Sequence, residues 1–271
     1  MKTFVSMVLA FIFLFSVSIN AGIVVKMKET SENMKMNMQS TMYLEKDRLR
    51  MEAMGDEQKQ IIIFRGDKNV FWTINPEEKS YFEMTQADIQ KMKAQMEKTK
   101  QMMMEQMKNM PEEQKKMMEE MMPSNMNMSE TVKTTYSKQS SGVKVGKWNC
   151  THFIGSKNGK KSEEIWVADW DQIGVSKNDL SVLQKMGEFF QALSQEASDF
   201  FEFGTEAWEK QIGMSGAPMR SVHYMDGKIS EQSEVTDVTK KDLDSSMFEL
   251  PAGYSKEDSP FDKMGEEMNQ Y

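Results

Sequence analysis

The strongest constraint on this chain is an alternation of apolar and polar residues that begins at residue 22 and continues to about residue 84. The clearest runs are Met34 to Gln39 and Arg48 to Ala53. A period of two sends successive side chains to opposite faces of a strand, so one face is buried and the other is solvated. Turn-forming residues separate the runs, at Glu45-Lys46-Asp47 and Arg65-Gly66-Asp67-Lys68-Asn69. The sequence therefore predicts an antiparallel meander over residues 22–84.

The period changes at Thr85, which is followed three residues later by an acidic residue, in a relative of the capping box that begins helices. Beyond it, apolar residues recur at steps of three and four and their multiples: Ile89, Met92, Met96, Met103, Met107 and Met110. We expect an amphipathic helix up to Pro111 and a second, short helix over residues 112–122. Residues 85–122 thus form a methionine-rich helical insertion in the strand pattern.

The rest of the chain returns to strands, interrupted by one long helical segment. Strands are predicted at Thr131–Ser137, Trp148–Ile154, Glu163–Ala168, Met219–Tyr224 and Lys228–Val238, with the strand region ending near Met247–Pro251. The segment from Asn178 to Phe201 has a helical apolar stripe: Leu183, Met186, Phe190, Leu193, Ala197 and Phe201. Its aromatic face is broader than a surface helix needs. We predict one domain over residues 22–254, followed by a flexible polar tail over residues 255–271.

The first 21 residues have the features of a secretory signal peptide. Lys2 supplies the positive charge, Phe4 to Val17 form the apolar region, and Ala21 is a small residue suited to cleavage before Gly22. The apolar run is too short to span a bilayer comfortably, and no cysteine follows it for lipid attachment. We therefore expect a periplasmic or secreted protein with no integral membrane segment.

Composition argues against several classes of function. The formal net charge is −8, which disfavours nucleic acid as a partner because phosphate neutralisation needs a basic face. A single cysteine and two histidines exclude a disulfide framework and make a multi-histidine metal centre improbable. The chain has no phosphate loop, dinucleotide fingerprint or zinc-protease motif. We predict no enzymatic activity and no cofactor.

Cys150 and His152 are the one pair that suggests nucleophilic chemistry. They are two residues apart on a predicted strand, so their side chains share a face. A nucleophile and base would also need a third orienting group and an oxyanion hole, and neither is visible in the sequence. We interpret Cys150 as a small buried residue, since unpaired cysteine is among the most buried residue types.

Three stretches, taken in order, resemble the exported bacterial proteins of the family DUF4412. They are Ile63-Phe64-Arg65-Gly66-Asp67-Lys68 with Ile74-Asn75-Pro76-Glu77-Glu78-Lys79-Ser80-Tyr81, Gly146-Lys147-Trp148-Asn149-Cys150-Thr151-His152-Phe153, and Phe248-Glu249-Leu250-Pro251-Ala252-Gly253-Tyr254. That family is similar to the lipoprotein carriers LolA and LolB. The resemblance implies an α+β fold, in which helices pack on the concave face of a curved, open antiparallel sheet and acyl chains bind there. It supplies no established activity, because fold does not determine function.

These features lead to a hypothesis of a carrier for an apolar ligand such as an acyl chain or a lipoprotein. If both helical stripes face the sheet, they line a hydrophobic groove with Met103, Met107, Phe190, Leu193 and Trp208. Methionine suits such a groove because its unbranched thioether can repack around different ligands.

Two alternatives remain open. Methionine sulfur also selects Cu(I), so a copper-buffering protein that binds through Met126 and Met128 is the first alternative. The second alternative is an envelope stress or structural protein without a small ligand.

Overall fold

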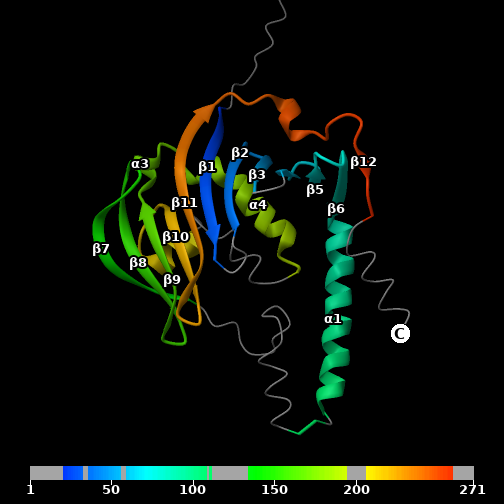
Figure 1. Ribbon diagram of the computed structural model, residues 1–271, viewed down its shortest axis with the longest axis horizontal. Coiled ribbons are helices and arrows are strands. Elements are labelled where there is room, and N and C mark those ends of the chain that lie inside the picture. Colours follow the sequence, from blue (N-terminus) through cyan, green and yellow to red (C-terminus); the bar gives the residue numbers. More distant parts are fainter. Residues whose placement is uncertain are drawn as a thin grey trace, which may run out of the picture.

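The computed structural model describes residues 21–32, 36–55, 59–108, 110–111, 134–193 and 206–258. These residues form a 12-stranded sheet in the order β12-β6-β5-β4-β3-β2-β1-β11-β10-β9-β8-β7. All neighbours pair antiparallel except β12, which runs parallel to β6. The sheet curves strongly and its two edges do not meet (Figure 1), so the predicted α+β fold with an open, curved antiparallel sheet is confirmed. The strands are β1 (Gly22–Ser31), β2 (Met36–Leu44), β3 (Arg48–Met54), β4 (Lys59–Arg65), β5 (Val70–Asn75), β6 (Ser80–Thr85), β7 (Thr135–Val145), β8 (Trp148–Lys157), β9 (Lys160–Ala168), β10 (Ala217–Met225), β11 (Lys228–Lys241) and β12 (Ser255–Lys256).

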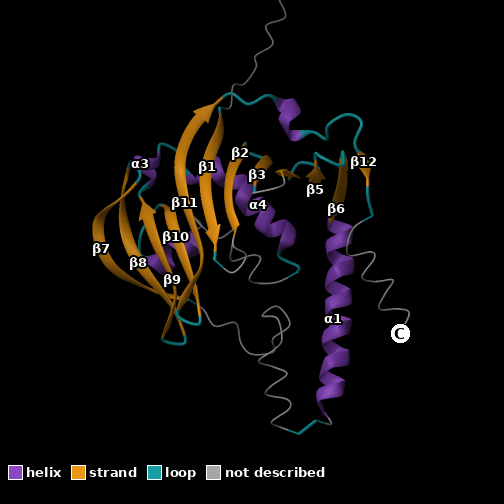
Figure 2. Cartoon of the chain, viewed as in Figure 1, coloured by secondary structure: helices purple, strands orange, loops and turns teal. Residues whose placement is uncertain are grey.

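The helical elements lie at different places around this sheet. They are α1 (Gln86–Lys108), α3 (Trp170–Ile173), the 3₁₀ helix η1 (Lys177–Leu180), α4 (Ser181–Phe190), α6 (Glu206–Ile212) and the 3₁₀ helix η2 (Ser245–Phe248). Helix α4 lies within the curve of the sheet, whereas α1 continues from β6 and extends away from it (Figure 2). Among the described helices, none is both long and apolar enough to cross a membrane.

The meander predicted for residues 22–84 is confirmed as β1 to β6, paired in chain order. Two of its turns contain residues in the left-handed region, Asn69 and Lys79, each with φ of 50°. The predicted helix start is also confirmed. The Asp88 carboxylate accepts hydrogen bonds from the Thr85 backbone N–H at 2.9 Å and from its hydroxyl at 2.6 Å. These patterns were predictable because each depends on residues close together in the chain.

Two rows of side chains cross the concave face of these six strands in register. The first row is Ile23, Leu44, Leu49, Phe64, Phe71 and Met84. The second row, two positions from the first row on each strand, is Val25, Met42, Met51, Ile62, Thr73 and Phe82. The first row forms the main core together with Val182, Met186 and Phe189 of α4. Helix α4 therefore covers the first row, and most of the second row remains half-buried.

The opposite face of β4 and β5 has its own core, closed by the C-terminal segment. Phe248 of η2 is fully buried against strand residues that include Ile63 and Trp72. The buried Arg65 guanidinium donates hydrogen bonds to Asp67, Glu249 and the Phe248 carbonyl. The sequence predicted a strand end at Met247–Pro251, and this was wrong, because η2 is a 3₁₀ turn that seats Phe248 on the sheet. The first residues of the predicted tail, Ser255–Lys256, pair with β6.

Other boundaries also differ from the predictions. The strand predicted at Thr131–Ser137 is β7, which extends to Val145. Its added residues are mostly polar and exposed because β7 is an edge of the sheet, so they carry no alternation. The predicted signal peptide, the helix at 112–122 and the tail beyond residue 258 lie outside the described residues.

The helix predicted from Asn178 to Phe201 is shorter, with η1 and α4 ending at Phe190; residues 194–205 lie outside the described part. Its buried side chains are Val182, Met186 and Phe189, whereas Leu183 and Phe190 of the predicted stripe are half-buried. Both Phe189 and Phe190 are apolar, and the sequence alone does not distinguish which of the two adjacent stripes faces the sheet.

Candidate functional site

The concave face carries a band of half-buried apolar side chains beside the part that α4 covers. We call this the apolar band; it consists of Met27, Met42, Met51, Phe82, Met92, Phe190 and Leu193, all packed against the main core without being fully covered. The strand residues come from β1, β2, β3 and β6, and the others come from α1 and from α4 with the turn after it. Large exposed apolar patches mark binding sites, and the band leaves seven apolar side chains partly uncovered. Methionine contributes four of the seven residues, which makes the surface deformable.

Four phenylalanine rings connect the apolar band to the buried core. Phe64 and Phe71 face each other on β4 and β5. Phe189 lies edge to face on Phe64, with ring centroids 5.5 Å apart, and Phe190 lies edge to face on Phe71 at 5.1 Å. Phe189 and Phe190 also contact each other at 5.0 Å. The quartet fixes the C-terminal half of α4 on the sheet, since such edge-to-face pairs stabilise beyond simple burial.

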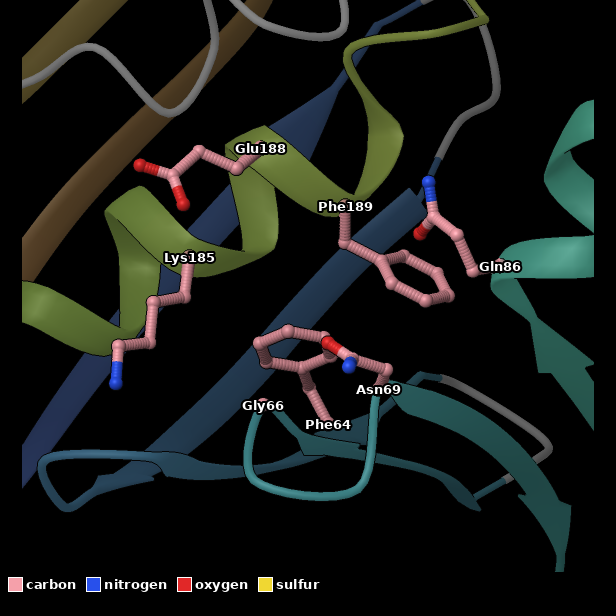
Figure 3. Close-up of a pocket in the computed structure, with 7 residues that line it drawn as sticks. All are labelled: Phe64, Gly66, Asn69, Gln86, Lys185, Glu188 and Phe189. Carbon is pink, nitrogen blue, oxygen red and sulfur yellow. The ribbon is translucent and has the colours of Figure 1, made fainter.

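A cavity of about 300 Å³ adjoins the quartet, and its lining comes from three elements: Phe64, Gly66 and Asn69 at the β4–β5 turn, Gln86 at the start of α1, and Lys185, Glu188 and Phe189 on α4. Phe189 points from α4 toward Phe64, and Asn69 and Gln86 lie beside the two rings (Figure 3). The cavity thus has an aromatic wall and a polar rim. Its volume is at the lower end of the range of small-ligand sites.

Local sequence explains how these elements converge. The capping interactions between Thr85 and Asp88 define where α1 begins and therefore where Gln86 lies. The N-terminal half of α4 is held to the β2–β3 turn, since the Ser181 hydroxyl donates to the Lys46 carbonyl at 3.2 Å and the Lys185 ammonium pairs with Asp47.

Gly66 allows the β4–β5 turn to lie close to these elements. A Cβ atom at residue 66 would lie 3.2 Å from the Asp47 carbonyl oxygen and 3.3 Å from the Phe64 ring. These distances are tighter than ordinary van der Waals contact, so any larger residue would push the turn away from the β2–β3 turn.

The five residues predicted to line a groove are not gathered at one place. Phe190 and Leu193 belong to the apolar band. Trp208 lies in a separate core, where α6 packs against Phe153, Ile165 and Val167. Met103 is half-buried and Met107 buried on α1, and neither belongs to a described core or cavity with the other three. The sequence-based prediction misplaced Trp208 because this residue belongs to a separate helix, α6. The position of that helix depends on contacts between residues far apart in the chain.

The methionine sulfur atoms that could bind Cu(I) lie partly inside and partly outside the described residues. Met126 and Met128 lie outside them. Met102 and Met104 of α1 are exposed, at 46% and 38%. A second cavity, of about 380 Å³, is lined by Met38 and Met54 among other residues of β1 to β3. Within the described part of the chain, no cluster of three or more His, Cys, Asp or Glu residues could hold a metal ion.

Cys150 and His152 share a face, as predicted, but they do not have the geometry of a nucleophile and its base. Cys150 is buried, and burial raises the pKa of its thiol to about 11, so the thiol stays protonated at neutral pH. The His152 ring bonds through Nε2 to the Glu164 carboxylate at 2.6 Å and stacks on Trp166 with centroids 4.5 Å apart. These contacts of the His152 ring are therefore with two residues of the neighbouring strand β9.

Glu164 is the centre of a polar network that sequence reasoning missed. Its carboxylate contacts His152 of β8, accepts a hydrogen bond from the Tyr224 hydroxyl of β10 at 2.6 Å, and pairs with Lys161. Burial opposes ionisation of Glu164, but the hydrogen bonds from Lys161, Tyr224 and His152 outweigh it and hold its pKa below the usual value. No pattern of neighbouring residues in the sequence predicts this network, because it depends on the register between β8, β9 and β10.

No protein-family model and no curated protein matches the chain. Among solved structures, an uncharacterized conserved protein from Thermus thermophilus is similar with a TM-score of 0.45 and 7% identity, over 88% of this chain and 90% of that one. MucB in the Pseudomonas aeruginosa MucA/MucB complex gives a TM-score of 0.36 and 5% identity, over 86% of this chain and 57% of that one. PNGF-II gives 0.36 and 11% identity, over 90% of this chain and 32% of that one. At these scores no ligand or activity transfers, and membership of DUF4412 stays a prediction.

Proposed function

We propose that this protein is an exported, non-enzymatic binding or carrier protein for an apolar ligand such as an acyl chain, carried free or on a lipoprotein. The observation that supports this is the apolar band, in which Met42, Met51, Phe82 and Phe190 stay only half-buried on the concave face. In a protein that binds no ligand, complete burial of these side chains would stabilise the fold by roughly 25 cal/mol for each square ångström of apolar area removed from water. A surface that stays half-covered is suited to a flexible apolar partner, and methionine side chains adapt to its shape.

The test uses an uncharged dye whose fluorescence rises in apolar surroundings. Wild-type protein is expected to bind the dye, and Phe190→Asp is expected to weaken binding by at least about tenfold, because a carboxylate in an apolar lining must be desolvated. Met225→Asp is the matched control, since Met225 is 61% exposed at the end of β10 and does not belong to the band. Circular dichroism must show both variants folded. A wild-type protein that neither binds the dye nor carries a ligand in native mass spectrometry overturns the proposal and favours a protein without a small ligand.

Cu(I) buffering is a second candidate, favoured by the presence of two thioethers, from Met38 and Met54, in the lining of the second cavity. Competition against a Cu(I) chelator tests it. Met38→Leu with Met54→Leu, and separately Met126→Leu with Met128→Leu, remove the sulfur atoms and keep the apolar volume. Loss of copper binding in either pair supports the candidate, and chelator competition that is unchanged in both pairs removes it.

A further inference from the structure

We infer that the apolar ligand carries an uncharged hydrogen-bonding group, such as a hydroxyl, ester or amide, and that the cavity beside the phenylalanine quartet binds this group in preference to an anion. The inference rests on the proposed function, since it names the head of the ligand whose chain lies on the apolar band. It has three parts: the cavity adjoins the band, its rim offers uncommitted amides, and its charges disfavour anions.

The cavity and the apolar band share the phenylalanine quartet. Phe64 and Phe189 line the cavity, and Phe190 belongs to the band. Each ring contacts the next at centroid distances of 5.0 to 5.5 Å. The end of a ligand chain that lies on Phe190 is therefore one ring contact away from Phe189 in the cavity lining.

The rim of the cavity carries two carboxamides, from Asn69 and Gln86. The side chains of Asn69 and Gln86 have no hydrogen-bond partner among the described residues, and both line the cavity (Figure 3). A carboxamide offers both a donor and an acceptor, so it pairs equally well with a hydroxyl, an ester or an amide. Both residues are exposed, so water can satisfy their amide groups as well.

The charges around the cavity oppose an anionic head. Lys185 is the one cation in the lining, and its ammonium is already paired with the Asp47 carboxylate. Glu188 is the one carboxylate among the lining residues, and it accepts a hydrogen bond from the Gln184 side chain at 3.4 Å. The lining therefore offers no unpaired cation to an anionic head, it contains one carboxylate, and the whole chain has a formal net charge of −8. An anionic head therefore meets repulsion, whereas an uncharged head meets none.

The test compares two ligands with the same saturated chain by displacement of the uncharged dye: a monoacylglycerol and a permanently anionic alkyl sulfonate. The wild-type protein is expected to bind the monoacylglycerol at least about fivefold more tightly at low salt. Glu188→Gln is expected to reduce this preference to less than about twofold, because it removes the one carboxylate of the lining. Gln86→Leu is expected to weaken the monoacylglycerol at least about threefold more than it weakens the dye. Gln90→Leu, an exposed position one turn along α1, is the matched control.

The outcomes separate this inference from the proposed function. Dye binding without a preference between the two heads, or with a preference for the sulfonate, overturns the inference and leaves the apolar site in place. A preference that survives both Glu188→Gln and Gln86→Leu also overturns it, because the cavity is then not the site of discrimination. Absence of binding by the dye and by both ligands overturns the proposed function itself.

Discussion

Phe71 of β5 and Phe190 of α4 meet edge to face, with ring centroids 5.1 Å apart and ring planes at 82°. The contact joins residues far apart in the sequence, and it lies where the covered core of the concave face passes into the half-buried apolar band. The same helix end therefore stabilises the fold and borders the candidate ligand site.

This contact predicts a measurable coupling between the two rings. Phe71→Ala and Phe190→Ala are each expected to lower the free energy of unfolding by about 2 kcal/mol, less than for a fully buried phenylalanine because both rings are half-buried. The double variant is expected to lose about 0.5–1.5 kcal/mol less than the sum of the two. Urea unfolding of the four proteins measures this coupling, and strict additivity contradicts the contact.

The C-terminal segment is predicted to be part of the folded unit. Phe248→Ala removes a fully buried ring from the core of β4 and β5 and is expected to cost about 3–5 kcal/mol of unfolding free energy. Met247→Ala, at the neighbouring half-buried position, is the control and is expected to cost clearly less. Thermal unfolding of both variants gives the comparison. A Phe248→Ala protein with wild-type stability would mean that the segment does not pack on this face.

Glu164 is predicted to make stability depend on pH. Because the pKa of Glu164 is lower in the folded protein than in the unfolded chain, its contribution is present above the unfolded value of about 4.3 and is lost as pH falls through the folded pKa. Glu164→Gln is expected to be less stable than wild type at pH 7, and this difference is expected to shrink below about pH 4. Urea unfolding at pH 7, 5 and 3.5 measures the difference, with Glu77→Gln in an exposed turn as control. A difference that stays constant with pH contradicts the role of the ionised carboxylate.

Cys150 is predicted to be inert in the native protein. Its thiol is buried, and burial raises its pKa to about 11, so little thiolate forms at pH 8. Alkylation by iodoacetamide is expected to be at least about 100-fold slower in the native protein than in urea. Rapid labelling of native protein would show that the thiol is accessible and would reopen the nucleophilic interpretation.

Patterns among neighbouring residues of the sequence predicted much of the fold. The alternation over residues 22–84, the hairpin turns and the Thr85–Asp88 cap all act between residues a few positions apart, and each is present in the structure. The methionine-rich, apolar character of the helical faces was also readable from the sequence. Strand β7 was only partly predictable, because an exposed edge strand does not need alternating apolar and polar residues.

The candidate site depended on tertiary structure. Sequence reasoning joined Phe190 to Trp208, but the structure places Phe190 against Phe71 and Trp208 in a separate core under α6. Periodicity shows that a helix has an apolar face, but it does not show which strands that face meets. That depends on how the curved sheet pairs β1 with β11 and on where α4 crosses its rows, which are contacts between residues far apart in the chain.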